Sequence, residues 1–472
     1  MKIGIIGTGI LGIQTALEVC SRTPDAEVFL IGKKDLPGTA TNAAGAMLNS
    51  IAEIDNSTFR SKYGIFLSNL CEKATVEWDH FNKKYNHFNH SQSNCDLVNK
   101  GTYLINTSSG DFYEDRDFKR IKEYCDSTGN TAVEIDPKDV PGLNPINHSR
   151  TIKALYIPSE GFVDVNRLKQ TIFQTLRSLN NFHWVDLNLS RFIYKGNIVQ
   201  QLILGDGSKI NVDKVVLCAG INSRQLLCSN PEIFNLVQPI FAGLGSTCRL
   251  KVDPLDQNKV IRTPNRGGAC GIYTIPLLND KNSDYNITIG ASNRVTDTPS
   301  IYPRMGSIAH FMQTAIDTIN MNFYKAEVVS LSTGWRPIAK DGYPLLGRIF
   351  DSNIILMTGT KRLGLHLSPL LANFSADLVL DDKDVLDIQK YFAPCRKPIY
   401  DLKMEESIEL IVESLMSEQY QHGYNPSGPL MHEQFVKSCF ENIEKGFSNI
   451  GLTEHGLPLD TFKLFLNGKV KV

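Results

Sequence analysis

Three glycines near the start of the chain constrain its fold more than any other feature. Residues 2–6 form a short apolar run, Gly7, Gly9 and Gly12 follow it in the pattern G-x-G-x-x-G, and residues 13–20 carry apolar side chains at helical spacing. In such a strand–turn–helix unit the first glycine makes the tight turn, the second lets the backbone approach a pyrophosphate, and the third lets the helix pack close to the strand. Free N–H groups at the helix start can bind phosphate. The pattern predicts a Rossmann-type sheet that binds a dinucleotide, with a purely structural turn as the alternative.

The second strand of this unit, expected at 27–31, lacks the acidic residue that usually follows it and binds the adenosine ribose. Gly32 stands there instead, followed by Lys33 and Lys34. Asp35 could reach back to the ribose, or the backbone of the loop could bind it. The two lysines could suit a ribose 2′-phosphate, and two solvated loop charges are the plainer interpretation.

The rest of the chain alternates helical and strand patterns. We expect helices at 57–86, 163–179, 303–323, 368–380, 404–420 and 430–445, and strands near 102–105, at 214–218, at 353–357 and in short segments between 237 and 295. Asp164 is the expected N-terminal cap of the second helix. The strand ending at Cys218 runs into Ala219 and Gly220, which is typical of a strand that returns to the nucleotide-binding sheet.

The order of these elements predicts an α/β fold in which two domains are interleaved and an appendage follows. The expected parts are 1–90, 161–235 and 331–394 for the nucleotide-binding domain, 91–160 and 236–330 for an antiparallel β-sheet substrate domain, and 395–472 for a helical C-terminal extension. Ile408, Ile411 and Leu415 give the extension an amphipathic pattern. We expect the extension to pack on its own chain or on a second copy. The more specific alternative is that it binds a partner or covers the active site.

Composition excludes several functional classes. The 472 residues have a formal net charge of -1, so neither nucleic acid nor a charged membrane surface is an expected partner. No apolar run is long enough to span a bilayer, and the fold is expected to begin at residue 3, without a targeting segment. The ten cysteines are scattered without a CxxC pair, which is typical of reduced thiols in a cytoplasmic protein. His80, His87 and His90 lack a recognisable fourth ligand, so no metal site is expected.

Five segments together resemble the glycine oxidase and D-amino-acid oxidase family of FAD-dependent oxidoreductases. They are the opening glycine motif, 40–48, 215–220, 333–337 with 341–347, and 358–364 with 368–369. The segments occur in the family's order and spread over residues 1 to about 385. The resemblance implies a Rossmann-like FAD-binding domain of the glutathione-reductase type. No cysteine is recognisable as a site of covalent flavin attachment, so we expect FAD to bind non-covalently.

The resemblance also implies which residues bind FAD. They are Gly7, Gly9, Ile10, Leu11, Gly12, Gly32, Lys33, Thr41, Asn42, Ala44, Gly45, Ala46, Met47, Leu189, Ala219, Gly220, Gly334, Gly359, Arg362, Leu363, Gly364 and Leu365. Thr360 stands where the family usually has a histidine, and this departure leaves the substrate open.

Three residues are implied in substrate binding. Arg336 matches the arginine of the family's G-x-R-P motif, which commonly clamps the substrate carboxylate, and Tyr273 lies where a tyrosine can assist it. Arg362 belongs to the loop that touches the flavin ring. An ordinary ion pair is the alternative role for Arg336. His366 is expected to pack into the start of a helix rather than act as a base.

The function implied is oxidation of the C–N bond of an amino acid or related small amine carboxylate to an imine, by hydride transfer to FAD. An FAD-dependent 2-hydroxy-acid dehydrogenase is one alternative, because it too needs a carboxylate clamp. A flavin-bearing subunit that acts mainly through a partner docked on 395–472 is another.

Overall fold

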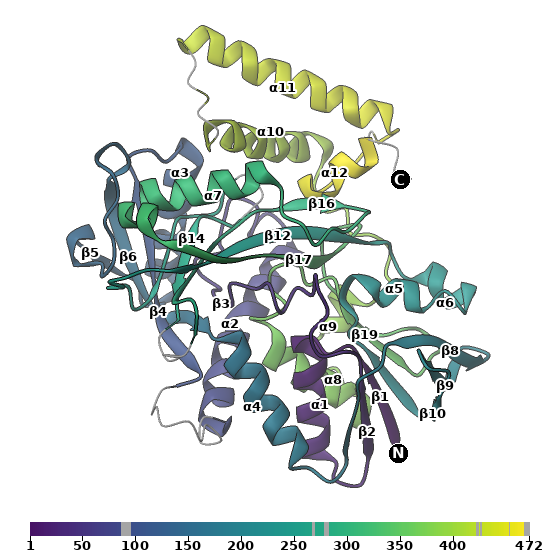
Figure 1. Ribbon diagram of the computed structural model, residues 1–472. Coiled ribbons are helices and arrows are strands. Elements are labelled where there is room, and N and C mark those ends of the chain that lie inside the picture. Colours follow the sequence, from purple (N-terminus) through teal and green to yellow (C-terminus); the bar gives the residue numbers. More distant parts are fainter. Residues whose placement is uncertain are drawn as a thin grey trace.

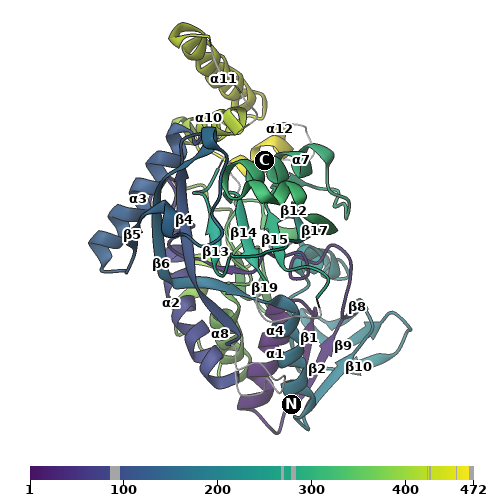
Figure 2. The same cartoon turned by 60° about the vertical axis from the view of Figure 1, so that its left-hand side comes forward.

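The computed structural model describes residues 1–85, 96–266, 270–277, 283–421, 424, 427–452 and 454–466. The two larger of three β-sheets lie one above the other, with helices around the lower sheet and a helical segment at the top of the molecule (Figure 1). Figure 2 shows the same arrangement turned about the vertical axis, with α12, Leu459–Leu466, beside the upper sheet.

The lower sheet has six strands in the order β18-β19-β11-β1-β2-β7. Their bounds are β1 Lys2–Ile6, β2 Glu27–Ile31, β7 Phe182–Val185, β11 Lys214–Leu217, β18 Leu345–Arg348 and β19 Ile354–Thr358. All neighbours are parallel except β18, which is antiparallel to β19. The strands expected at 2–6 and 27–31 are confirmed, and those at 214–218 and 353–357 are shifted by a residue at most. Residues far apart in the sequence therefore build one sheet.

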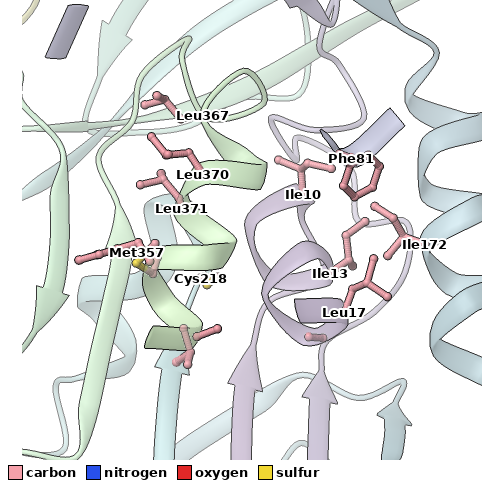
Figure 3. Close-up of a cluster of buried hydrophobic side chains, with 14 of the residues drawn as sticks. Ile10, Ile13, Leu17, Phe81, Ile172, Cys218, Met357, Leu367, Leu370 and Leu371 are labelled. Atoms are coloured by element: carbon pink, nitrogen blue, oxygen red, sulfur yellow. The ribbon is translucent and has the colours of Figure 1, made fainter. Parts of the chain in front are cut away.

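Four helices pack around this sheet: α1 Ile10–Arg22, α2 Lys62–Tyr85, α4 Val165–Arg177 and α8 Ser368–Leu380. Ile13 and Leu17 on α1 lie between α4 and α8, in a cluster that also contains Ile172 and Leu371 (Figure 3). Asp164 caps α4 as expected, accepting hydrogen bonds from the N–H groups of the first turn. Residues 57–61 form turns, so α2 begins five residues later than expected.

The upper sheet runs β16-β12-β15-β14-β13-β4-β6-β3, with β17 on β12 and β5 on β6. Its strands are β3 Met47–Leu48, β4 Val98–Thr107, β5 Val133–Ile135, β6 Thr151–Val163, β12 Ile240–Lys251, β13 Val260–Arg262, β14 Tyr273–Pro276, β15 Ile287–Gly290, β16 Arg294–Thr296 and β17 Glu327–Ala339. The expected antiparallel pattern holds for every pair except β4 and β13, which are parallel. These two strands come from distant segments, so no hairpin turn fixes their relative direction.

Strand β17 carries the G-x-R-P motif into the upper sheet. It pairs with β12 along its whole length, with Arg336 opposite Gly243. The strand crosses residue 331, where the sequence predicted the change from one domain to the other. Arg336 therefore approaches the space between the sheets from above, while the glycine turn after β1 approaches it from below.

The remaining elements connect and cover the sheets. They are α3 Phe112–Thr128, α5 Ser223–Leu226, α6 Pro231–Leu236, α7 Met305–Thr318, α9 Ile388–Phe392, the strands β8 Leu189–Lys195, β9 Ile198–Leu204 and β10 Lys209–Asn211, and the short 3-10 turns η2 Pro137–Asp139, η3 Asn147–Ser149, η4 Gly220–Asn222 and η5 Met321–Lys325. The prediction of one helix over 303–323 is wrong in its length, because α7 ends at Thr318. Asn320 then caps a separate turn, η5, by accepting from the N–H of Asn322.

Within its described residues, the extension forms three helices: α10 Met404–Gln421, α11 Pro429–Asn449 and α12 Leu459–Leu466. The first two match the expected helices closely, and α12 was not expected. Ile411, Met416, Phe447 and Phe462 belong to a buried cluster of their own within the extension. Helix α12 contacts β16, and α11 lies outermost (Figure 1). None of the helices that the structure describes is both long and apolar enough to cross a membrane.

Candidate functional site

A cavity of about 650 Å³ lies at the carboxyl ends of β1, β11 and β19, below the upper sheet. It extends from Gly32 and Leu189 at one end, past the β1–α1 turn, to Tyr273 and Arg362 at the other. Ligand sites of α/β sheets commonly lie at the carboxyl ends of the strands. The volume of the cavity suits a small-molecule cofactor.

The β1–α1 turn has the shape that its glycines predict. Gly7 has φ +116°, and a Cβ there would overlap the carbonyl of Cys218. A Cβ on Gly12 would overlap the carbonyl of Gly7, so this glycine allows α1 to pack against the turn. Gly9 precedes α1, and the N–H of Ile10 donates to the hydroxyl of Thr41 at 3.0 Å. The first turn of α1 therefore faces the cavity with its N–H groups, as an anion site requires.

The loop of small residues at 38–47 lies along the same cavity because aromatic rings press against it. A Cβ on Gly38 would overlap the indole of Trp335, and one on Gly45 would lie 2.7 Å from the hydroxyl oxygen of Tyr273. Larger side chains in this loop would push either ring away. The loop thus keeps its backbone close to whatever occupies the cavity.

Most of the residues expected to bind the cofactor lie on the wall of this cavity. They are Gly7, Gly9, Ile10, Leu11, Gly32, Thr41, Ala44, Gly45, Ala46, Met47, Leu189, Ala219, Gly220, Gly334, Arg362, Leu363, Gly364 and Leu365, and Tyr273 and Arg336 lie there too.

Four expected residues, Gly12, Lys33, Asn42 and Gly359, lie off the wall. Gly12 is behind the turn. The carbonyl of Lys33 accepts from Thr8 Oγ1 at 2.6 Å, and its side chain is exposed. The side chain of Asn42 accepts from Lys169 Nζ at 2.8 Å, which holds it away from the cavity.

Lys169 also forms an ion pair with Asp35. Its ammonium lies 2.9 Å from Asp35 Oδ1, while the lysine itself is 5% exposed. Asp35 therefore does not reach back to the end of β2, and the backbone at Gly32 remains the group that faces the cavity there.

Arg336 brings a positive charge to the cavity wall that the described part of the chain does not neutralise. Its Nη1 donates to the carbonyl of Ser292 at 3.0 Å and to Asn293 Oδ1 at 3.5 Å. Among the described residues no carboxylate lies within 4.0 Å of its guanidinium. The guanidinium lies over Gly245, where any side chain would overlap it. The arrangement suits an anionic ligand that pairs with the guanidinium.

Arg362 shares one carboxylate with a second arginine. Glu53 lies 2.6 Å from Nη1 of the fully buried Arg262 and 3.2 Å from Nη2 of Arg362. Burial acts to raise the pKa of Glu53, but the two guanidinium groups outweigh it and hold that pKa below its usual value. Nη1 of Arg362 is buried without a hydrogen-bond partner among the described residues. The trio carries one excess positive charge beside the cavity.

Tyr273 and His366 complete this end of the cavity with neutral groups. Tyr273 is 3% exposed, and burial raises the pKa of its hydroxyl, which stays protonated at neutral pH. His366 is buried, and its Nε2 lies 2.8 Å from the carbonyl oxygen of Cys71. Burial lowers the pKa of His366 to about 4, so its ring is neutral at neutral pH. The packing role expected for this histidine agrees with these contacts.

The histidines considered as metal ligands do not come together in the described residues. His80 Nδ1 lies 3.7 Å from Glu77 Oε1 on the exposed side of α2, and His87 and His90 lie outside the described residues. Within the ranges that the structure describes, no three His, Cys, Asp or Glu side chains are placed to hold a metal ion.

Three residues that the sequence did not single out also contribute to the site. They are Glu53, Asn293 and Asp460. Asp460, at the start of α12, lies 2.8 Å from Lys361 Nζ and accepts from Asn293 Nδ2 at 3.0 Å. Asn293 in turn contacts Arg336. Glu53 follows the loop at 38–47 closely, and this position could have indicated that it lies near the cavity. Nothing in the local sequence around Asp460 indicates a contact with residues 293 and 361.

Known proteins resemble this chain over most of its length. It is 23% identical over 395 residues to a bifunctional protein ThiO/ThiG of Trichormus variabilis, covering 80% of this chain and 52% of that relative. The chain thus spans about half the length of the curated relatives that it matches first.

Solved structures share the fold at low identity. The glycine oxidase of Geobacillus kaustophilus aligns with a TM-score of 0.69 and 18% identity, covering 84% of this chain and 98% of that one. The glycine oxidase of Bacillus cereus aligns with a TM-score of 0.66 and 20% identity, covering 82% and 99%. An L-proline dehydrogenase from P. horikoshii aligns with a TM-score of 0.66 and 17% identity, covering 84% and 97%.

The family model described as FAD dependent oxidoreductase, DAO, matches residues 2–378. The cavity fits the cofactor of that family, because the backbone of Gly7, Gly9 and Gly45 lines it without side chains, and the N-terminus of α1 lies at its wall, where its N–H groups could bind a pyrophosphate. The resemblance inferred from the sequence is therefore confirmed, and the chain belongs to the DAO family of FAD-dependent oxidoreductases.

Proposed function

We propose that this protein oxidises the C–N bond of an amino acid or related small amine carboxylate to an imine, with FAD bound non-covalently. The observation that carries the proposal is Arg336, a guanidinium on the cavity wall that, within the described residues, donates to the neutral oxygens of Ser292 and Asn293 and pairs with no carboxylate. A planar guanidinium pairs with a carboxylate through two parallel hydrogen bonds, which fixes the carboxylate in orientation as well as in position.

The names of the similar proteins support an amino acid as substrate. Two of the matched structures are called glycine oxidases and one an L-proline dehydrogenase, and two curated relatives are called D-amino acid dehydrogenases. Amino acids share a carboxylate and an amine on one carbon, which is the arrangement that a carboxylate clamp beside a redox cofactor would hold.

The side chains around the clamp have separate tasks. FAD, when bound, accepts the hydride that leaves the substrate carbon. Arg336 holds the carboxylate, and the protonated hydroxyl of Tyr273 can donate to it. The excess charge of Arg362 with Arg262 and Glu53 favours an anion at the same end of the cavity. Fixing the carboxylate places the amine-bearing carbon, and this positioning is the main contribution that the protein makes to the rate.

The reaction needs no basic side chain in this cavity. A substrate with a neutral amine loses a hydride from carbon and a proton from nitrogen, and water then hydrolyses the imine to an oxo acid and ammonia. His366 is poorly placed to take that proton, because its Nε2 is bonded to the carbonyl of Cys71.

Anaerobic titration of the purified holoprotein tests the proposal. The ligands are amino acids of both hands, N-methyl amino acids and 2-hydroxy acids, and the readout is the flavin absorption band. Bleaching by an amine supports the proposal. Bleaching by 2-hydroxy acids alone, or a protein that takes up no FAD, contradicts it. Release of the flavin into the supernatant after acid precipitation checks that attachment is non-covalent.

Replacing the clamp gives the second test. In Arg336→Ala we expect the KM of the substrate to rise about 100-fold while FAD stays bound, since losing a charge-assisted bidentate contact costs about 3 kcal/mol. Arg294→Ala is the control, because Arg294 lies on the neighbouring strand β16 and off the cavity wall. Equal kinetics in the two variants would refute the clamp.

A further inference from the structure

A second cavity, of about 360 Å³, lies between the start of α2, helix α3 and the C-terminal extension. Tyr113, Tyr343, Tyr400, Leu402 and Ser414 are among its lining residues. The volume lies within the range of small-molecule sites, and the lining mixes aromatic, aliphatic and polar groups as such sites do.

The two cavities meet at one boundary. Glu53, Lys361 and Arg362 line both of them, together with Thr360 and Leu363. Arg336 and Tyr273 line the first cavity only. A ligand whose carboxylate lies at Arg336 therefore has the second cavity on the far side of Arg362.

The extension supplies the outer wall of the second cavity. Tyr400 lies edge-on to His455 with ring centroids 4.2 Å apart, and Ser414 faces the cavity from α10. Asp460 fixes α12 to the cofactor loop through Lys361 at 2.8 Å. Because the extension has its own buried cluster, this wall is a packed structure and not a loose tail.

Away from the boundary that it shares with the first cavity, the charged groups of the second cavity disfavour a negatively charged guest. Arg116 contacts Asp117 at 3.3 Å and Glu413 at 3.1 Å, so one arginine serves two carboxylates. Burial, and then the nearby carboxylate of Asp55, raise the pKa of Asp117 to about 7. Arg266 is likewise occupied by a buried carboxylate, Glu114, at 2.6 Å.

We propose that the second cavity is a side-chain subsite, walled by the C-terminal extension, that receives the side chain of an amino-acid substrate larger than alanine and neutral or basic at its end. This inference rests on the proposed function, since it takes the carboxylate to lie at Arg336. It makes the extension a determinant of substrate choice.

Filling the cavity from the extension tests the subsite. Ser414→Trp places an indole in the cavity from α10, and Glu409→Trp places the same group on the exposed side of that helix. The measurement is kcat/KM for leucine, phenylalanine and lysine relative to glycine, with both hands of each chiral amino acid. We expect the wild type to prefer the long side chains and Ser414→Trp to lower that preference about tenfold or more, with Glu409→Trp unchanged. A wild type that prefers glycine or glutamate, or an unchanged preference in Ser414→Trp, overturns the subsite.

Binding without turnover separates the subsite from the proposed function. The probes are acetate, hexanoate, 6-aminohexanoate and glutarate, titrated into each holoprotein while the flavin absorption spectrum is followed. We expect hexanoate and 6-aminohexanoate to bind more tightly than acetate or glutarate, and Ser414→Trp to remove the advantage. If no amino acid reduces the flavin but this order of affinities holds, the proposed function fails and the subsite stands. Affinities independent of chain length overturn the subsite. Should Ser414→Trp not fold, as judged by FAD content, Ser414→Leu serves in its place.

Discussion

At the scale of single residues, Glu53 controls the balance of charge beside the cofactor cavity. It compensates the guanidinium of Arg262, which has no exposed surface, and it shares that task with Arg362. A buried charge that loses its partner keeps the cost of its lost hydration, so this carboxylate matters more for stability than a surface carboxylate would.

Replacing Glu53 with Gln should therefore lower the free energy of unfolding by about 3–5 kcal/mol. The measurement is urea denaturation of the apoprotein, which keeps the effect on folding apart from the effect on FAD binding. Asp382→Asn is the matched control, because Asp382 pairs with Arg348 where both side chains are partly exposed, and such pairs contribute about 0–1 kcal/mol. Equal losses in the two variants would show that the buried pair contributes no more than a surface one.

His366 should make the stability of the protein depend on pH. Burial lowers its folded-state pKa from 6.5 to about 4, so between these values the unfolded chain binds a proton that the folded chain does not. Stability from this group is present above pH 6.5 and is lost as the pH falls towards 4. From pH 6.5 to 5 the loss should be about 1.5 kcal/mol. His366→Gln should lose that much less over the same interval in urea titrations, and parallel curves for both proteins would contradict the shift.

At the scale of elements, the sequence predicted best where periodicity, caps and glycine spacing agree. The β1–α1 unit, α4 with its Asp164 cap and α8 all form where these signals coincide. Helix α3 was missed although its signals are present. Asp111 and Glu114 form a capping box at its start, and Gly129 ends it in the left-handed region.

The site could be predicted only in part, because some of its contacts join distant elements. The glycines, Tyr273 and Arg336 were found through motifs that lie within one segment. Asn293 and Asp460 reach the site through tertiary packing of α12 on β16, which no local pattern encodes. Asn42 lies off the cavity wall for the same reason, since its side chain accepts from the buried Lys169 of α4.

The β1–α1 turn gives a prediction that belongs to the element. In Gly12→Ala the new methyl group would overlap the carbonyl of Gly7, and backbone must move to admit it. We expect the apoprotein to lose about 2–3 kcal/mol of stability and the purified protein to retain less FAD. Gly306→Ala is the control, because nothing lies within 4 Å of a Cβ there and the position is within α7. That substitution should be neutral or stabilising by up to about 1 kcal/mol, and the two variants are compared by thermal unfolding and by absorbance.

At the scale of the whole molecule, the C-terminal extension is joined to both walls of the site. Asp460 contacts Lys361 on the cofactor loop and Asn293 beside the clamp, and Arg396 binds the buried Asp341 at 2.8 Å. These contacts favour a role in the chain's own site over the alternative in which the extension serves mainly to dock a partner.

Asp460→Ala should weaken the binding of a carboxylate ligand about three- to tenfold, because Asn293 would lose a hydrogen-bond acceptor that helps to hold it against Arg336. Asp460→Asn keeps an acceptor for Asn293 and loses the ion pair with Lys361, so its affinity should be intermediate. Glu454→Ala changes an exposed residue of the same segment and is the control. Acetate titration of the flavin spectrum measures all three, and identical affinities would show that the extension does not act on the clamp.

The position of β1 in the middle of its sheet also bears on how the protein is synthesised. Its neighbour β2 follows within 21 residues of Ile6, at Glu27, but the strand on its other side, β11, begins only at Lys214. At ~5–20 residues per second, the ribosome needs roughly 10 to 40 s to make the chain between them. During that interval the apolar first strand has one edge open, and an open edge invites pairing with other chains. The nascent protein is therefore expected to need a chaperone over its first two hundred residues, before the cofactor cavity can form.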